Sequence, residues 1–284
     1  MIGLSVSSFY YQPIVDFKTK AITDADLRDK IEEIQSEFPR YGYRRVKKHL
    51  LLYEGLCVNE KRIRRVMREY GLLAEIKKSF VTQTTDSDHE FQIYPNLVKH
   101  REVNGPNEVW VADLTYIRIA TCFVYLAVIL DLFSRKVIGW AISKSLQKEV
   151  CVEALKMAFE TRDPAPGCIH HSDRGVQYAS GEYIAFLKSR DFQISMSRKG
   201  NPYDNAFAES FMKTLKYEEV LLWNYETYAE VIERVPYFIE EVYNKKRLHS
   251  SLGYLPPEMF EQQMLEKSKT VCNQQLKLKE KSSS

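Results

Sequence analysis

The order of apolar runs between residues 106 and 216 constrains the fold more than any other feature of the sequence. Three runs typical of β-strands come first, and the middle one is apolar enough to lie at the centre of a sheet: residues 108–119, 122–133 and 136–143. Helices and strands then alternate along the chain, at residues 148–162, 167–173, 180–190, 192–197 and 205–216. This order predicts an α/β unit in which a mixed five-stranded sheet is flanked by helices.

A separate group of three helices is predicted ahead of this α/β unit. Thr23 and Asn59 suit the N-caps of the first and third helices, while Gly55 and Gly71 suit the ends of the second and third. In the third helix, the spacing of four apolar residues predicts a buried stripe: Ile63, Val66, Met67 and Tyr70. The opposite face is basic and carries Lys61, Arg64, Arg65 and Arg68.

Helix, short turn and basic amphipathic helix is the helix-turn-helix arrangement, whose second helix enters the major groove of DNA. The whole chain carries a formal charge of only +3, but residues 38–72 hold ten Lys/Arg, Arg44 and Arg45 among them, against three Glu. Such a local excess is typical of a phosphate-binding surface. A small helical bundle with a solvated basic face is the alternative interpretation.

Composition narrows the remaining possibilities. The five cysteines are scattered and form no C-x-x-C pair, which argues against a disulfide framework and against a cysteine-based zinc site. No apolar run approaches the length of a membrane span, and no signal peptide is recognisable, so we expect a cytosolic protein. The expected organisation is an N-terminal arm (1–22), a helix-turn-helix domain (23–75), a linker (76–105), an α/β core (106–265) and a disordered basic tail (266–284).

Three carboxylates are candidates for catalysis. Asp113 interrupts the first strand of the α/β unit, and Asp173 ends the fourth. Because the first and fourth strands can be neighbours, these two side chains can meet, and the last helix can bring Glu209 beside them. Three clustered acids repel one another, and divalent cations such as Mg²⁺ or Mn²⁺ relieve that repulsion. Two such ions about 3.5–4 Å apart support phosphodiester chemistry. Taken singly, however, each aspartate is more typical of a turn or cap.

The predicted helix 205–216 combines an apolar face with a polar row. Phe207, Phe211 and Leu215 recur every four residues, whereas Glu209 and Lys216 stand two turns apart on another side. Asn205 precedes Glu209 in the same row, which by itself is equally typical of a solvated flank.

At this point the sequence resembles a known family. Asp113, Asp173 and Glu209, with 35 residues between the last two, match the D-D-35-E pattern of retroviral-integrase-like transposases. Longer segments resemble the second-reading-frame transposases of the bacterial insertion-sequence-three family: VWVADLTYI, YLAVILDLFSRKVIGW, HHSDRGVQY, SMSRKGNPYDNAFAESFMKTLK and YNKKRLHSSLGYLPPEMF. YGYRRVKKHL and VNEKRIRRVMREYGL are similar to the family's helix-turn-helix region, so the resemblance covers about residues 3–262.

The resemblance implies a ribonuclease-H-like fold and a transposase that recognises the terminal inverted repeats of an insertion sequence and performs Mg²⁺-dependent strand cleavage and strand transfer. It assigns Asp113, Asp173 and Glu209 as metal ligands, for two Mg²⁺ or Mn²⁺ ions and no zinc, and Lys216 as a DNA contact. It also implies double-stranded DNA as partner, a homo-oligomer on DNA, an upstream-frame DNA-binding protein or fusion, and a bacterial cytoplasm or nucleoid as the place of action. The open alternatives are a regulator with an inactive catalytic fold and a ribonuclease-H-type nuclease.

Other polar residues have weaker assignments. Arg198 and Lys199, before the last helix, are candidates for contacts with DNA phosphates. The segment 245–249 is a further candidate DNA surface through Lys245, Lys246, Arg247 and His249. We expect Asp131 to pair with Arg135 or to cap a turn, and Asp204 to cap a helix. Of His170 and His171, one is expected to pack beneath the sheet while either helps to shape the metal site.

Overall fold

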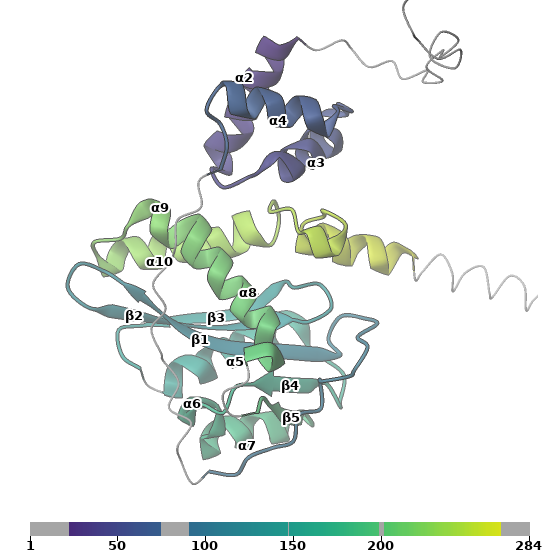
Figure 1. Cartoon of the computed structure of the whole chain (residues 1–284). Coiled ribbons are helices and arrows are strands. Elements are labelled where there is room, and N and C mark those ends of the chain that lie inside the picture. Colours follow the sequence, from purple (N-terminus) through teal and green to yellow (C-terminus); the bar gives the residue numbers. More distant parts are fainter. Residues whose placement is uncertain (1–22, 75–90, 147, 199–201, 268–284) are drawn as a thin grey trace, which may run out of the picture. The chain divides into compact units, whose positions relative to one another are not determined.

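The computed structural model describes residues 23–74, 91–146, 148–198 and 202–267 (Figure 1). The chain divides into two compact units, residues 1–75 and 76–284. The N-terminal arm and most of the tail lie outside the described residues, as does the first half of the linker.

The first unit consists of the three predicted helices: α2 (Asp24–Glu37), α3 (Tyr43–Glu54) and α4 (Glu60–Glu69). Thr23 caps α2 in a capping box with Asp26, and the Asn59 side chain accepts a hydrogen bond from the N–H of Lys61 at the start of α4. The side chains of Leu27, Ile31, Val46, Leu50, Ile63, Val66 and Met67 form the buried core.

One residue of the predicted stripe on α4 is placed differently. Tyr70 is 46% exposed, and the Arg28 guanidinium lies 5.2 Å from its ring centroid. The reason is that α4 ends at Glu69, so that Tyr70 is already the C-cap and no longer follows the helical period.

The second unit is built on a five-stranded sheet: β1 (Val109–Arg118), β2 (Phe123–Asp131), β3 (Val137–Ser143), β4 (Ile169–Ser172) and β5 (Gln193–Met196). The strand order is β3-β2-β1-β4-β5, with antiparallel pairing among the first three strands and parallel pairing of β1 with β4 and of β4 with β5. This is the predicted ribonuclease-H-like mixed sheet, and the first and fourth strands are neighbours as expected.

Helices cover both faces of this sheet (Figure 1). One face packs against α5 (Lys148–Arg162), α6 (Val176–Ala179) and α7 (Gly181–Ser189) around Trp110, Leu155 and Leu187. The other face packs against α8 (Ala206–Leu215) and α10 (Tyr228–Tyr237) around Val111, Phe211 and Val235. Two apolar cores, one on each face, therefore hold the strands between the helical layers.

The chain beyond α8 forms several helical pieces that sequence patterning does not predict. They are the π-helical turn Lys216–Val220, α9 (Leu221–Trp223), α10, a second π-helical stretch Phe238–Tyr243, the 3₁₀ turn Ser250–Leu252 and a helix over residues 257–267.

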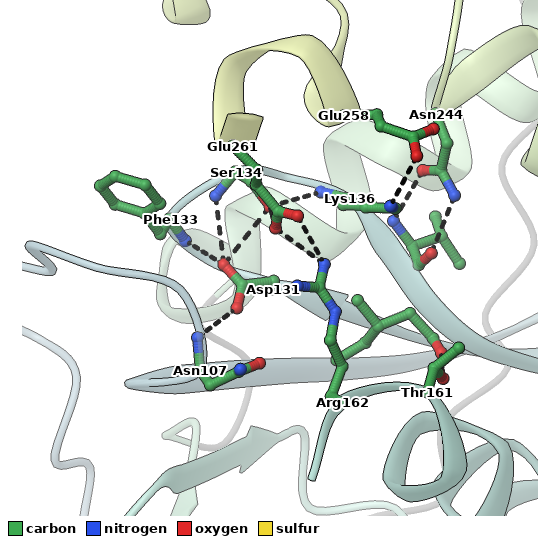
Figure 2. Close-up of polar contacts among 12 residues, drawn as sticks. Asn107, Asp131, Phe133, Ser134, Lys136, Thr161, Arg162, Asn244, Glu258 and Glu261 are labelled. Atoms are coloured by element: carbon green, nitrogen blue, oxygen red, sulfur yellow. Dashed lines mark hydrogen bonds and ion pairs between the residues drawn. The ribbon is translucent and has the colours of Figure 1, made fainter. Parts of the chain in front are cut away.

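Buried polar contacts fasten this C-terminal segment to the sheet (Figure 2). Glu261 accepts hydrogen bonds from the Ser134 hydroxyl at 2.5 Å and from Arg162 Nη2 at 2.7 Å. The Asn244 amide bonds both the N–H and the C=O of Val137, each at 2.9 Å, and so acts as a partner for the start of edge strand β3.

The second half of the predicted linker is irregular in structure but packs on this unit. The N–H of Leu97 donates to the Ser195 hydroxyl at 2.9 Å, and Val98 and Val103 pack against the core that contains Val111. Pro95 and Leu97 therefore lie beside β5, and this part of the predicted linker does not act only as a tether.

Candidate active site and DNA-facing residues

The pairing of β1 with β4 brings two of the candidate carboxylates together. Val111 and His171 are partners in the parallel register, and Asp113 and Asp173 each follow two residues later. The two aspartates therefore leave adjacent strands at matching depth. The N–H of Gly175 donates to Asp173 Oδ1 and the N–H of Leu114 to Asp113 Oδ1, each at 2.9 Å.

Helix α8 is pinned to the same strand beside Asp113. The Asn205 side chain, which is buried, donates from Nδ2 to the carbonyl oxygen of Ala112 at 3.1 Å. Four residues later Glu209 is exposed, while the opposite side of α8 is buried through Ala208, Phe211, Met212 and Leu215. Nothing in the sequence distinguished Asn205 from a solvated flank residue, because its acceptor is 93 residues away along the chain.

The four-residue spacing predicted that Phe207 lies on the buried apolar face of α8, but it does not. Its side chain is 40% exposed, and the Arg135 guanidinium lies 4.7 Å from its ring centroid. In the first turn of α8 it is Ala208 that packs into the core, and of the predicted row only Phe211 and Leu215 are buried.

The three carboxylates interact electrostatically. Burial, together with the nearby charge of Asp173, raises the pKa of Asp113 to about 8, and the charge of Glu209 adds to the effect. The ammonium of Lys216 acts in the opposite direction on the same group. Partial burial also raises the pKa of Glu209. Negative charges from Asp113, Asp173 and Glu209 are thus held near one another, with the Lys216 ammonium as a nearby cation.

Such a donor set fits a hard divalent cation, because carboxylate oxygens are the ligands that Mg²⁺ and Mn²⁺ prefer. Among the residues that the structure describes, no group of three His, Cys, Asp or Glu side chains is close enough together to hold a metal ion. The fit therefore rests on the chemistry and the mutual charge of Asp113, Asp173 and Glu209.

Lys216 lies at the junction between α8 and the π-helical turn that follows it. Its ammonium nitrogen is 4.6 Å from the ring centroid of Tyr116, a residue of β1. The side chain is half-buried. The Lys216 ammonium thus lies against β1, the strand that carries Asp113.

Both histidines of the pair in β4 are buried in hydrogen-bonded positions. His170 Nε2 contacts the Tyr183 hydroxyl at 2.8 Å. His171 Nδ1 contacts the Ser195 hydroxyl at 2.8 Å, and Nε2 donates to the carbonyl oxygen of Asp204 at 2.9 Å. Burial lowers the pKa of both imidazoles. We expected one of them to pack inside, and the structure buries both. His171 also holds the chain just before Asn205.

The segment before α8 is braced by an ion pair. Asp204 does not cap the helix as expected. Its carboxylate accepts from the Arg198 N–H at 2.9 Å and from the Arg198 guanidinium at 3.0 and 3.1 Å. That guanidinium lowers the pKa of Asp204. Arg198 is exposed at the surface but already paired, whereas Lys199 lies outside the described residues.

Asp131 caps the turn between β2 and β3, which was one of its two expected roles (Figure 2). The N–H groups of Asn107, Phe133 and Ser134 donate to its carboxylate at 2.6, 2.9 and 3.1 Å. The Arg135 side chain instead contacts Phe207. Asp131 is therefore a structural residue.

The segment predicted to extend the DNA surface is mostly turned inward. Arg247 and His249 are buried, and Arg247 pairs with Glu218. Lys245 is exposed and pairs with Glu241 at 2.6 Å. The basic residues of this segment gave no indication of its burial, because the partner of Arg247 lies 29 residues away in the sequence.

In the first unit, the basic residues of α4 differ in their partners. Lys61, Arg64, Arg65 and Arg68 are all exposed. Arg65 is paired with Asp24 at 2.6 Å and with Glu69 at 3.1 Å. Within the described chain, Arg64 and Arg68 have no carboxylate partner, and the Arg64 guanidinium lies 5.6 Å from the Tyr43 ring centroid. On α3, Arg44 is exposed and Arg45 is half-buried over Tyr41.

A search of the described helices finds none that is long and apolar enough to cross a membrane.

Comparison with known proteins identifies the units. Residues 22–80 match an HTH-like domain, and residues 103–202 and 190–257 each match an integrase core domain. The chain is 39% identical over 246 residues to the transposase for insertion sequence element IS904 of Lactococcus lactis, which covers 83% of this chain and 93% of the relative.

Other relatives agree with this. The chain is 38% identical to the insertion element IS600 uncharacterized 31 kDa protein of Shigella sonnei, covering 92% of this chain and 96% of the relative. It is 37% identical to the transposase InsF for insertion sequence IS3A of Escherichia coli, covering 80% and 78%. Among solved structures, the simian T-cell lymphotropic virus intasome matches with a TM-score of 0.47 and 15% identity, covering 81% of this chain and 74% of that one. The chain belongs to the insertion-sequence-three family of transposases, of the second-reading-frame type, and is a DDE polynucleotidyl transferase.

Proposed function

We propose that this transposase binds the terminal inverted repeats of its insertion sequence and catalyses Mg²⁺-dependent strand cleavage and strand transfer at Asp113, Asp173 and Glu209. The observation that carries the proposal is the placement of Asp113 and Asp173 at matching depth on adjacent parallel strands, with α8 pinned at Ala112. In this proposal α8 brings Glu209 toward the two aspartates, so that carboxylates from three separate parts of the chain act together.

In this proposal the carboxylates of Asp113, Asp173 and Glu209 hold two divalent ions. When bound, such ions activate a water or hydroxyl nucleophile and stabilise the leaving oxygen of a phosphodiester. The chain's own contribution is position: β1 and β4 fix the two aspartates, and Asn205 fixes the start of the helix that bears Glu209. Lys216 binds a DNA phosphate next to the one that reacts, since its ammonium lies at β1 over Tyr116.

The first unit supplies recognition of the repeats. The exposed basic face of α4 enters a major groove, where Lys61, Arg64 and Arg68 contact phosphates or base edges. Arg44 and Arg45 on α3, and Arg65 on α4, contact the flanking backbone, and Arg198 and Lys199 contact DNA near the cut. The working complex is a homo-oligomer that joins element ends to target DNA, either alone or with an upstream-frame protein or fusion.

The experiment is strand cleavage of a plasmid that carries the coding sequence with its native flanking DNA. Asp113→Asn, Asp173→Asn and Glu209→Gln should each lower the cleavage rate in Mg²⁺ by at least about a hundredfold. Each substitution removes a ligand of the metal ions that would stabilise the charge developing on the phosphate. Circular dichroism and melting curves verify folding. Asp131→Asn is the matched control, since that buried carboxylate caps a turn. Cleavage at the wild-type rate by any one of the three folded variants excludes the assignment.

A further inference from the structure

We infer that Arg247 is a positioning residue that, by clamping Glu218, fixes Lys216 against β1, the strand that carries Asp113. The inference rests on the proposed role of Lys216 in binding DNA. In this inference Arg247 of the motif YNKKRLHSSLGY acts inside the protein near the active site. The sequence had suggested instead that the basic residues of the motif contact DNA.

The clamp is a buried two-point ion pair. Arg247 Nε and Nη2 lie 2.7 Å from Glu218 Oε2 and Oε1 respectively. The side chains of Arg247 and Glu218 are only 5% and 12% exposed. The remaining nitrogen, Nη1, contacts the His249 ring at 3.3 Å, and the guanidinium lies 5.9 Å from the centroid of the Tyr243 ring. A fork-on-fork pair of this kind fixes orientation as well as distance.

Glu218 lies in the π-helical turn that begins at Lys216. In that turn the N–H of Leu221 donates to the carbonyl oxygen of Lys216, five residues back. Glu219, the next residue, is buried as well and accepts from the Tyr225 hydroxyl at 2.7 Å and from Arg234 Nε at 2.9 Å. Two consecutive glutamates of one turn are therefore each held by an arginine from the C-terminal segment.

Isolated π-helical turns are rare, and they recur at functional sites. A buried ion pair adds little net stability compared with apolar residues of the same size, but it selects one geometry. Here the selected geometry sets the backbone of Lys216, and the ammonium then lies 4.6 Å from the Tyr116 ring. The lysine side chain is flexible, so the ammonium can reach many positions. A fixed backbone position of Lys216 restricts those positions to the neighbourhood of one phosphate.

The first experiment measures the position of Lys216 without DNA. Lysines of the full-length chain are reductively ¹³C-methylated, and the Lys216 resonance is assigned with Lys216→Arg. We expect the Tyr116 ring to shift this resonance away from those of exposed lysines, as Tyr116→Leu verifies. Arg247→Met should abolish the shift. Arg247→Lys, which keeps the charge but not the fork, should reduce it.

Arg162→Met is the matched control, because Arg162 forms a comparably buried pair with Glu261 that does not touch the π-helical turn. It should leave the Lys216 resonance in place. If Arg247→Met proves unstable through the uncompensated Glu218, Glu218→Met combined with Arg247→Met removes both charges and tests the same point. A wild-type Lys216 resonance in a folded Arg247 variant overturns the inference.

The second experiment measures strand cleavage. Lys216→Ala and Arg247→Met should each slow it by about 10–100-fold, since small displacements of a positioning group have effects of that size. The combined variant should be no slower than Lys216→Ala alone, because Arg247 acts through Lys216. Additive losses overturn the inference. If Lys216→Ala cleaves normally while the resonance still moves with Arg247, the DNA role of Lys216 fails but the positioning by Arg247 is supported.

Discussion

At the residue scale, Asp113 opposes the stability of the folded chain when no metal is bound. Its carboxylate is half-buried and lies in the field of Asp173 and Glu209, which raises its pKa. Asp113→Asn should therefore raise the free energy of unfolding in EDTA at pH 8 by about 1–3 kcal/mol after allowance for solvent screening. Thermal melting measures this. Asp191→Asn, on an exposed turn, is the control, and a lower melting temperature for Asp113→Asn would contradict the electrostatic picture.

His170 should make the protein sensitive to acid. Burial lowers its pKa to about 3, against an ordinary value of 6.5, so between these values only the unfolded chain binds the proton. The stability that neutral His170 contributes is complete above pH 6.5 and is lost progressively as the pH falls toward 3. His171 acts in the same direction.

The measurement is urea unfolding at pH 7 and pH 5. One proton changes the free energy by about 1.4 kcal/mol per pH unit, so His170→Gln should reduce the loss between these pH values by about 1–2 kcal/mol. His100→Gln, at an exposed position, should leave the loss unchanged. An equal loss in wild type and in His170→Gln would rule out this origin.

At the scale of secondary-structure elements, α5 approaches β3 very closely at Gly139. A Cβ there would collide with the carbonyl oxygen of Ala154 and lie 2.8 Å from the backbone nitrogen of Ala158, so α5 crosses β3 where no side chain intervenes. Gly139→Ala should destabilise the chain by about 1–3 kcal/mol or more through overpacking. Gly181→Ala, with open space at the start of α7, should be neutral or gain up to about 1 kcal/mol. Equal unfolding midpoints for the two variants would show that α5 can move to accommodate a Cβ at position 139, contrary to this prediction.

The sequence predicts those helices and strands whose formation depends on local patterns of apolar residues. The five strands, the three N-terminal helices, α5, α7 and α8 follow local apolar patterning and caps. The predicted stripes fail at their ends. Tyr70 lies beyond the last residue of α4, and Phe207 is exposed although Ala208 beside it is buried.

The segment after α8 is not predictable in this way, because polar contacts over long separations determine it. Glu261 bonds to Ser134, which lies 127 residues earlier in the chain, and Arg247 pairs with Glu218, which lies 29 residues earlier. In the sequence these charges are indistinguishable from surface residues. The proposed carboxylate triad could be predicted through its spacing and family motifs. The hydrogen bonds of Asn205 and His171, which position the start of α8, could not.

At the scale of the whole molecule, the proposed DNA-binding charges and the proposed catalytic charges lie in different units of the chain. The acids of the proposed catalytic site belong to the second unit, while the densest basic segment belongs to the first. Loss of cations from α4 should therefore weaken DNA binding without changing the pH or metal dependence of cleavage in DNA that is already bound.

The two classes of arginine on α4 give a test of this division in the full-length chain. Arg64 and Arg68 have no carboxylate partner among the described residues, whereas Asp24 and Glu69 hold the Arg65 guanidinium. Each phosphate contact that is lost should flatten the dependence of log affinity on log salt by about one unit. Arg64→Ala with Arg68→Ala should thus lower the slope by about two units, and Arg65→Ala by less than one. Fluorescence anisotropy with terminal-repeat DNA over a salt series measures both slopes. If Arg65→Ala alone flattens the slope as much as the double variant, the ion pairs of Arg65 must open on DNA and α4 does not present the face proposed here.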